Sequence, residues 1–169
     1  SEALQRLAAA GRMQTPTDLV RSLIGIAVPE GAPLPSLRTT EDFVAFLRAT
    51  PSIAYTLRGV SGQHMARLVE DLGLADIVRP KATIVDGFAG VPLREGKVAA
   101  AVQQIAELRF TGATNIVPLP DAIQVETTFA VAVSPGTVRP EAAAEIVAAL
   151  TSSAAASAYA GSGTVPAFK

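Results

Sequence analysis

Cysteine and tryptophan are absent from this chain of 169 residues, and His64 is its single histidine. Without cysteine the chain has no disulfides, no thiol catalysis and no cysteine-ligated metal. One histidine, with no EF-hand and no HExxH pattern, provides no basis for a metal site. The phosphate loop, the GxGxxG fingerprint and the GxSxG serine motif are missing as well. We therefore expect neither a metal nor a cofactor.

Clusters of basic residues are also lacking. The 14 lysines and arginines are scattered and are balanced by 15 acidic residues, which gives a net charge of −1. Nucleic acid binding needs several cations on one face, so we expect no nucleic acid partner. No run of about 18 apolar residues predicts a membrane-spanning helix. The opening SEALQRL has neither the basic nor the apolar region of a signal peptide.

Apolar residues make up 49% of the chain, which is enough for a core, and the length fits one domain or two small lobes. Segments with strand and helix patterns alternate, which predicts an α/β fold with a mostly parallel sheet flanked by helices. The expected strands are 22–28, 52–56, 81–85, 98–102, 115–119 and 124–134. The expected helices are 1–11, 39–50, 62–72, 91–94, 103–108, 140–150 and 152–160.

Small or polar residues follow three consecutive predicted strands. Ligands of open α/β sheets lie at the carboxyl ends of strands, and helix N-termini there attract anions. Glycines let the backbone approach a ligand closely, and hydroxyl, amide and guanidinium groups donate hydrogen bonds to it. We therefore expect an anion site formed by Arg58, Ser61, Gly62, Asp86, Gly87, Gln103 and Gln104.

A structural interpretation of the same residues stays open. Ser61 is also a favoured N-cap type, and the glycines of 86–90 suit a plain turn. The glutamine pair would then begin a solvated helix, and Arg58 would be a surface side chain. His64, Asp86 and Glu107 are the candidates for proton transfer, but spacing ties no second group to any of them, so we assign no catalytic residue.

Several motifs resemble the molybdate-binding-protein-like branch of the periplasmic solute-binding proteins. They include GIAVPEGAPLP, a helix with TTEDFVAFL, the strand SIAY, the helix start VSG and the block ending in QQIAE. The segments PLPDAIQVETTFAVAVS and EAAAEIVAALTSSAAASAYAGSG are similar to that family's return crossover and closing helices. The likeness keeps its order and spacing over essentially the whole chain.

The resemblance implies two lobes joined by crossover strands, with an oxyanion or organic carboxylate in the cleft. Ser61 corresponds to a ligand contact at a helix N-terminus, and Asp86 or Gly87 corresponds to a backbone-amide contact. Gln104 takes a position that is often tyrosine in molybdate binders. Such proteins deliver their ligand to the permease of an ABC transporter in the periplasm, and we expect this role here.

The family's opening serine loops have no counterpart in this sequence. We therefore expect residues 1–24 to be a first-lobe remnant and crossover, 25–116 the second lobe, and 117–169 the return crossover and closing first-lobe helices. An exposed first-lobe edge would favour a homodimer. Relatives of this branch include isomerases of unsaturated carboxylic acids, so the alternative is an isomerase of a di- or tricarboxylic acid.

Overall fold

The computed structural model describes residues 2–168, which form two compact units. Unit 2 is the continuous segment Leu23–Glu126, and unit 1 combines the chain up to Ser22 with the chain from Thr127 onward. The sequence grouped residues 117–126 with the return crossover, whereas the structure places them in unit 2. They lie there because a strand within them pairs with the first strand of that unit.

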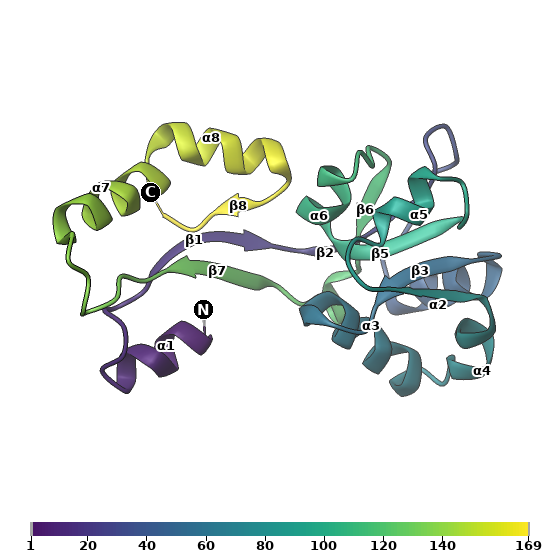
Figure 1. Ribbon diagram of the computed structural model, residues 1–169. Helices are drawn as coiled ribbons and strands as arrows, with labels where there is room; N and C mark the ends of the chain where they lie inside the picture. Colours follow the sequence, from purple (N-terminus) through teal and green to yellow (C-terminus); the bar gives the residue numbers. More distant parts are fainter. Residues whose placement is uncertain (1, 169) are drawn as a thin grey trace. The chain divides into compact units, whose positions relative to one another are not determined.

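The sheet of unit 2 has five strands in the order β4-β3-β5-β2-β6 (Figure 1). Strand β3 runs parallel to β4 and β5, whereas β2 runs antiparallel to β5 and β6. The α/β class is confirmed, and the sheet is more mixed than the alternation of strands and helices indicates. The strands are β2 (Ile24–Ala27), β3 (Ile53–Thr56), β4 (Ala82–Val85), β5 (Ala100–Gln104) and β6 (Ile116–Pro118).

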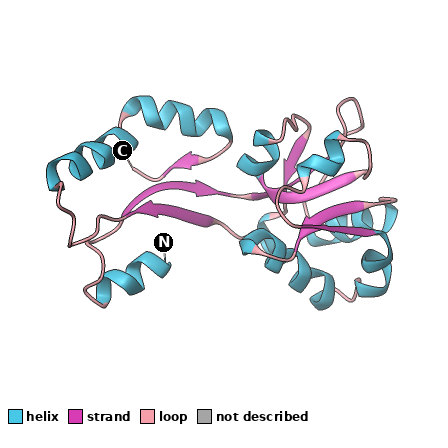
Figure 2. Ribbon diagram, viewed as in Figure 1, coloured by secondary structure: helices cyan, strands magenta, loops and turns pink. Residues whose placement is uncertain are grey.

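Helices pack against the two faces of this sheet, and alternate strand residues point to opposite faces. One face, with residues such as Ile26 and Ile53, packs on α2, α3 and α4. The other face, with Ala54 and Ala101, packs on α5 and α6. Figure 2 shows these helices in cyan around the magenta strands. They are α2 (Thr40–Ala49), α3 (Gly59–Asp71), α4 (Ala75–Val78), α5 (Gly90–Arg94) and α6 (Ile105–Phe110), with 3-10 turns η1 (Arg79–Lys81) and η2 (Asp121–Ile123).

Unit 1 has a small antiparallel sheet in the order β7-β1-β8. Among its described residues only Val20 and Ser22 are buried. The sequence did not predict β1, because its polar residues Thr, Asp and Arg hide the strand pattern. The strand predicted over 124–134 is present as the shorter β7. The elements are α1 (Glu2–Ala9), β1 (Thr17–Ser22), β7 (Thr127–Val131), α7 (Pro140–Leu150), α8 (Ser153–Ser162) and β8 (Val165–Pro166). No helix among residues 2–168 has the length and apolarity needed to cross a bilayer.

Gln124 completes the hydrogen bonding of the first strand of unit 2. Its Nε2 donates to the carbonyl of Ile24 at 2.9 Å, and its Oε1 accepts from the Ile24 N–H at 2.9 Å. The Ile24 carbonyl also accepts from the Leu119 N–H at 3.0 Å, but Ile24 is fully buried, so its N–H has no water to replace Gln124. The side chain of Gln124 therefore makes the two hydrogen bonds that the backbone of a neighbouring strand would otherwise make with Ile24.

We expect Gln124→Met to destabilise the protein by about 1–3 kcal/mol, the cost of leaving a buried polar group unsatisfied. Urea unfolding measures the change, and Gln63→Met, at an exposed position of α3, is the control. Equal unfolding midpoints for the two variants would contradict a structural role for Gln124.

Candidate functional site

The carboxyl ends of β4, β3 and β5 lie next to one another at one edge of the unit 2 sheet. They do so because β4 and β5 both pair with β3 in parallel. Each of the predicted site residues lies at or just after one of these ends. We call them the strand-end set: Arg58, Ser61 and Gly62 after β3, Asp86 and Gly87 after β4, and Gln103 and Gln104 at the end of β5.

Arg58 and Asp86 form an ion pair across the neighbouring ends of β3 and β4. Arg58 Nη1 lies 3.5 Å from Asp86 Oδ1, and the two side chains are 86% and 81% exposed. An exposed pair of this kind contributes only about 0–1 kcal/mol to stability. The guanidinium is therefore held near the edge but stays accessible to a ligand.

Ser61 is the third residue of α3, because the helix begins at Gly59 and Arg58 takes the N-cap position. The N-cap interpretation of Ser61 is therefore wrong. The residue is 5% exposed, and its hydroxyl has no hydrogen-bond partner among residues 2–168. The first N–H groups of a helix carry a partial positive charge. Ser61 thus adds a buried donor to an end of the helix that favours anions.

Gly62 brings α3 close to the end of β3. A Cβ at this position would lie 2.2 Å from the backbone oxygen of Thr56, which is far inside the contact distance. The Thr56 hydroxyl donates to the carbonyl of Arg58 at 2.6 Å and closes the turn between strand and helix. Thr56 is not among the site residues predicted from the sequence, although a threonine near a turn commonly hydrogen-bonds the backbone there. Gly62 therefore has a packing role, and ligand contact by Gly62 stays a prediction.

Gln103 and Gln104 are the last two residues of β5. The structural interpretation, in which they begin a solvated helix, is therefore wrong. Gln103 is 4% exposed and Gln104 is 5% exposed. Gln103 Oε1 accepts from the N–H of Ala89 at 2.7 Å, and its Nε2 donates to the carbonyl of Gly87 at 3.1 Å. Gly87 has a φ of +129°, which favours glycine. The amide of Gln103 is therefore occupied by the loop after β4.

The three candidates for proton transfer each have a partner that accounts for their position. His64 Nε2 donates to the carbonyl of Ile123 at 2.6 Å, which anchors α3 to η2. Burial raises the pKa of Glu107, and hydrogen bonds from the Gln104 backbone and the Gln103 side chain partly offset this effect. Asp86 pairs with Arg58. Within the described part of the chain, no group of three or more His, Asp or Glu side chains is arranged to hold a metal.

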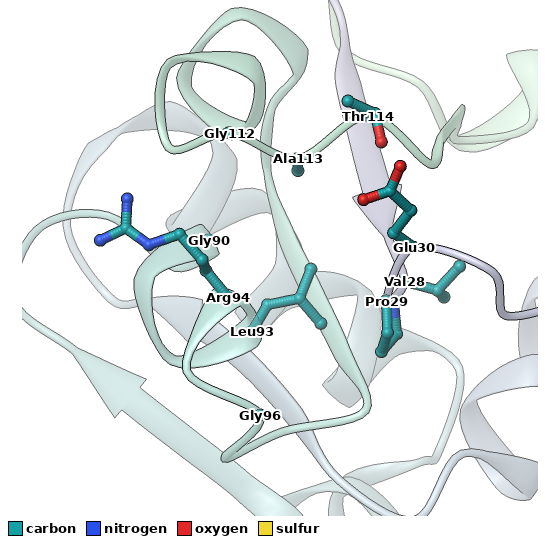
Figure 3. Close-up of a pocket in the computed structure, with 10 residues that line it drawn as sticks. All are labelled: Val28, Pro29, Glu30, Gly90, Leu93, Arg94, Gly96, Gly112, Ala113 and Thr114. Atoms are coloured by element: carbon teal, nitrogen blue, oxygen red, sulfur yellow. The ribbon is translucent and has the colours of Figure 1, made fainter.

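A cavity of about 300 Å³ lies elsewhere in unit 2 (Figure 3). Glu30 and Thr114 stand on one side of it and Arg94 on the other. It contains no member of the strand-end set, so the shape of unit 2 does not by itself mark the predicted site. The lining residues are Val28, Pro29, Glu30, Gly90, Leu93, Arg94, Gly96, Gly112, Ala113 and Thr114.

Comparison with known proteins relates nearly the whole chain to one family. The family described as bacterial extracellular solute-binding protein matches residues 1–164. Aconitate isomerase of a Pseudomonas species is 31% identical, over 97% of this chain and 64% of that relative. The chain thus spans less than two thirds of the length of this curated relative.

Two solved structures are similar at lower identity. Peb3 of Campylobacter jejuni has a TM-score of 0.67 at 16% identity, covering 96% of this chain and 74% of its own, and Peb3 has also been solved bound to L-phospholactate. A protein described as the tungstate ABC transporter of Geobacter sulfurreducens has a TM-score of 0.55 at 14% identity, covering 90% of this chain and 70% of its own. At these identities the likeness establishes the fold.

Proposed function

The chain belongs to the family of bacterial extracellular solute-binding proteins, and we propose that it binds a small anion at the strand-end set of unit 2. The observation that carries the proposal is the buried Ser61 hydroxyl at the start of α3, beside the accessible guanidinium of Arg58. Tungstate, L-phospholactate and aconitate, which the names of the similar proteins contain, are all small anions.

The donors at this edge suit both oxyanions and carboxylates. The first N–H groups of α3 and the Ser61 hydroxyl bind any anionic oxygen. Arg58 adds a planar fork that matches the two oxygens of a carboxylate. We therefore propose an organic carboxylate as the preferred ligand and an inorganic oxyanion as the second choice.

Titration calorimetry with a panel of anions tests the proposal. The panel contains tungstate, molybdate, L-phospholactate, citrate, and cis- and trans-aconitate, with glucose and putrescine as neutral and cationic controls. An anion at about 100 times its Kd should also raise the free energy of unfolding by about 2.7 kcal/mol. Heats no larger than those of glucose for every anion would refute anion binding.

Replacing Asp86 should strengthen binding. In Asp86→Asn the carboxylate that pairs with Arg58 is gone, so the guanidinium no longer divides its charge between Asp86 and the ligand. We expect the Kd for the bound anion to fall about two- to fivefold, the effect of removing one exposed charge interaction. Calorimetry of Asp86→Asn beside Asp121→Asn, an exposed control in η2, measures the change. Weaker binding would indicate that Asp86 contacts the ligand itself.

We also propose that the protein is the solute-binding component of an ABC transporter, acts in the periplasm and delivers its anion to a permease. The family match and the transporter name of the Geobacter neighbour support this role. Deletion of the gene should abolish uptake of the anion at concentrations near its Kd. Unchanged uptake would contradict a transport function while leaving anion binding intact.

An isomerase acting on aconitate or a similar unsaturated acid is the second candidate, and the 31% identity to aconitate isomerase favours it. The half-buried carboxyl of Glu107, with its raised pKa, is the side chain of this edge best suited to transfer a proton. Proton NMR of cis-aconitate incubated with the protein detects the trans isomer. If the wild type converts cis-aconitate and Glu107→Gln does not, the protein is an isomerase that uses Glu107. If the wild type converts none, aconitate is excluded as its substrate.

A further inference from the structure

The side chain of Gln103 holds the loop that joins β4 to α5. Its Oε1 accepts from the Ala89 N–H at 2.7 Å, and its Nε2 donates to the Gly87 carbonyl at 3.1 Å. Both contacts reach from the sheet to a loop 14 to 16 residues away in sequence. Gln103 is almost fully buried, so water does not compete for these bonds.

These two contacts have opposite polarity and therefore specify an amide. The N–H of Ala89 needs an acceptor, and the carbonyl of Gly87 needs a donor. Ionised glutamate supplies only acceptors, and methionine has a similar length but offers neither contact at useful strength. The side chain of Gln103 also acts on the carboxyl of Glu107 at the start of α6, where it opposes the rise in pKa that burial causes.

The loop that Gln103 holds carries part of the proposed anion site. Asp86 precedes Gly87 directly and pairs with Arg58. Fixing the Gly87 carbonyl toward the sheet sets the direction of the Gly87–Phe88 peptide. It thereby restricts the position of Asp86, the residue before Gly87, and with it the place of the ion pair. A side chain whose amide is already occupied in this way is poorly available to contact a ligand itself.

We propose that Gln103 is a positioning residue for anion binding, acting through the loop Asp86–Ala89 and not by touching the ligand. The inference rests on the proposed function, because it concerns the same edge of the sheet. It replaces the expectation that Gln103 contacts the ligand directly. The affinity of the site then depends on a side chain that supports the loop and does not touch the ligand.

The test compares Gln103→Met and Gln103→Glu with the wild type, using trans-aconitate and tungstate as probes. Gln103→Met removes the hydrogen bonds to Gly87 and Ala89. This loss should weaken binding about tenfold, the effect of about one hydrogen bond. Gln103→Glu should be equally weak at about pH 8, where the new carboxylate repels the Gly87 carbonyl. At about pH 5 the protonated carboxyl, whose pKa burial and the neighbouring Glu107 raise, donates to that carbonyl and restores binding.

A control and a second readout separate positioning from other roles. Each affinity is taken relative to the wild type at the same pH, and Gln5→Glu, exposed on α1, should show no such recovery. Hydrogen exchange of the Ala89 amide should be faster in Gln103→Met than in the wild type. Weaker binding with unchanged Ala89 exchange, or wild-type affinity in Gln103→Glu at pH 8, would overturn the positioning role.

Failure of the proposed function gives a different result. If the wild type binds none of the anions of the calorimetry panel, anion binding is refuted, and the positioning role falls with it even where Ala89 exchange shows that Gln103 still holds the loop. If the wild type binds and both Gln103 variants bind equally well, only the positioning role is refuted.

Discussion

Gly62→Ala is expected to lower the free energy of unfolding by about 3 kcal/mol or more, the upper part of the range for overpacking. The new Cβ would lie 2.2 Å from the backbone oxygen of Thr56, and the Thr56 backbone is held by its pairing with Val85 of β4. Helix α3 must therefore shift away from the end of β3. Because that shift displaces the start of α3, we also expect anion binding to be lost.

Gly161→Ala is the matched control for this prediction. Gly161 also lies in a helix, but a Cβ there has no atom within 4 Å. Alanine is favoured over glycine in a helix by about 1 kcal/mol, so this variant should be unchanged or slightly more stable. Chemical unfolding of both variants measures the difference, and a Gly62→Ala protein as stable as Gly161→Ala would show that α3 packs differently.

Ser61→Ala should weaken anion binding about 10- to 100-fold, the cost of one hydrogen bond to a charged group. Its hydroxyl bonds to no other described residue, so the unfolding midpoint should stay close to that of the wild type. This combination identifies a ligand contact, because a structural hydroxyl would change both quantities. Calorimetry and thermal unfolding supply the two values.

Ser157→Ala provides the comparison, since Ser157 is an exposed serine of α8 whose hydroxyl donates to the Ser153 carbonyl. It should leave affinity unchanged. Full affinity in Ser61→Ala would remove this residue from the site, and a large loss of stability would show that the hydroxyl supports the fold.

The sequence predicted the meeting of three strand ends because that meeting depends on strand order and direction. Alternating strands and helices imply parallel neighbours, and β4, β3 and β5 are such neighbours. The polar residues at the ends of these strands then lie at one edge. The direction of β2 could not be predicted from the sequence, because a buried strand has the same residue pattern in either orientation.

The roles of individual residues at that edge were harder to predict. A serine can serve as an N-cap or as a donor to a ligand, and the sequence does not distinguish these two roles. For Ser61 the observed helix start at Gly59 distinguishes them. Gln103 resembled a ligand because a polar side chain at a strand end has no partner visible in the sequence. Its partners, Gly87 and Ala89, belong to a loop whose path depends on tertiary packing.

The division of the chain into one continuous and one discontinuous unit sets an order for folding during synthesis. Unit 2 is a single stretch of chain, so all its strands are synthesised before β7, the partner of β1. Strand β1 therefore waits unpaired while about a hundred residues are added, which takes on the order of ten seconds. Its charged residues Asp18 and Arg21 are of the kind that keep a free strand edge from pairing with other chains. The polarity that hid β1 in the sequence thus protects it while the polypeptide is still growing.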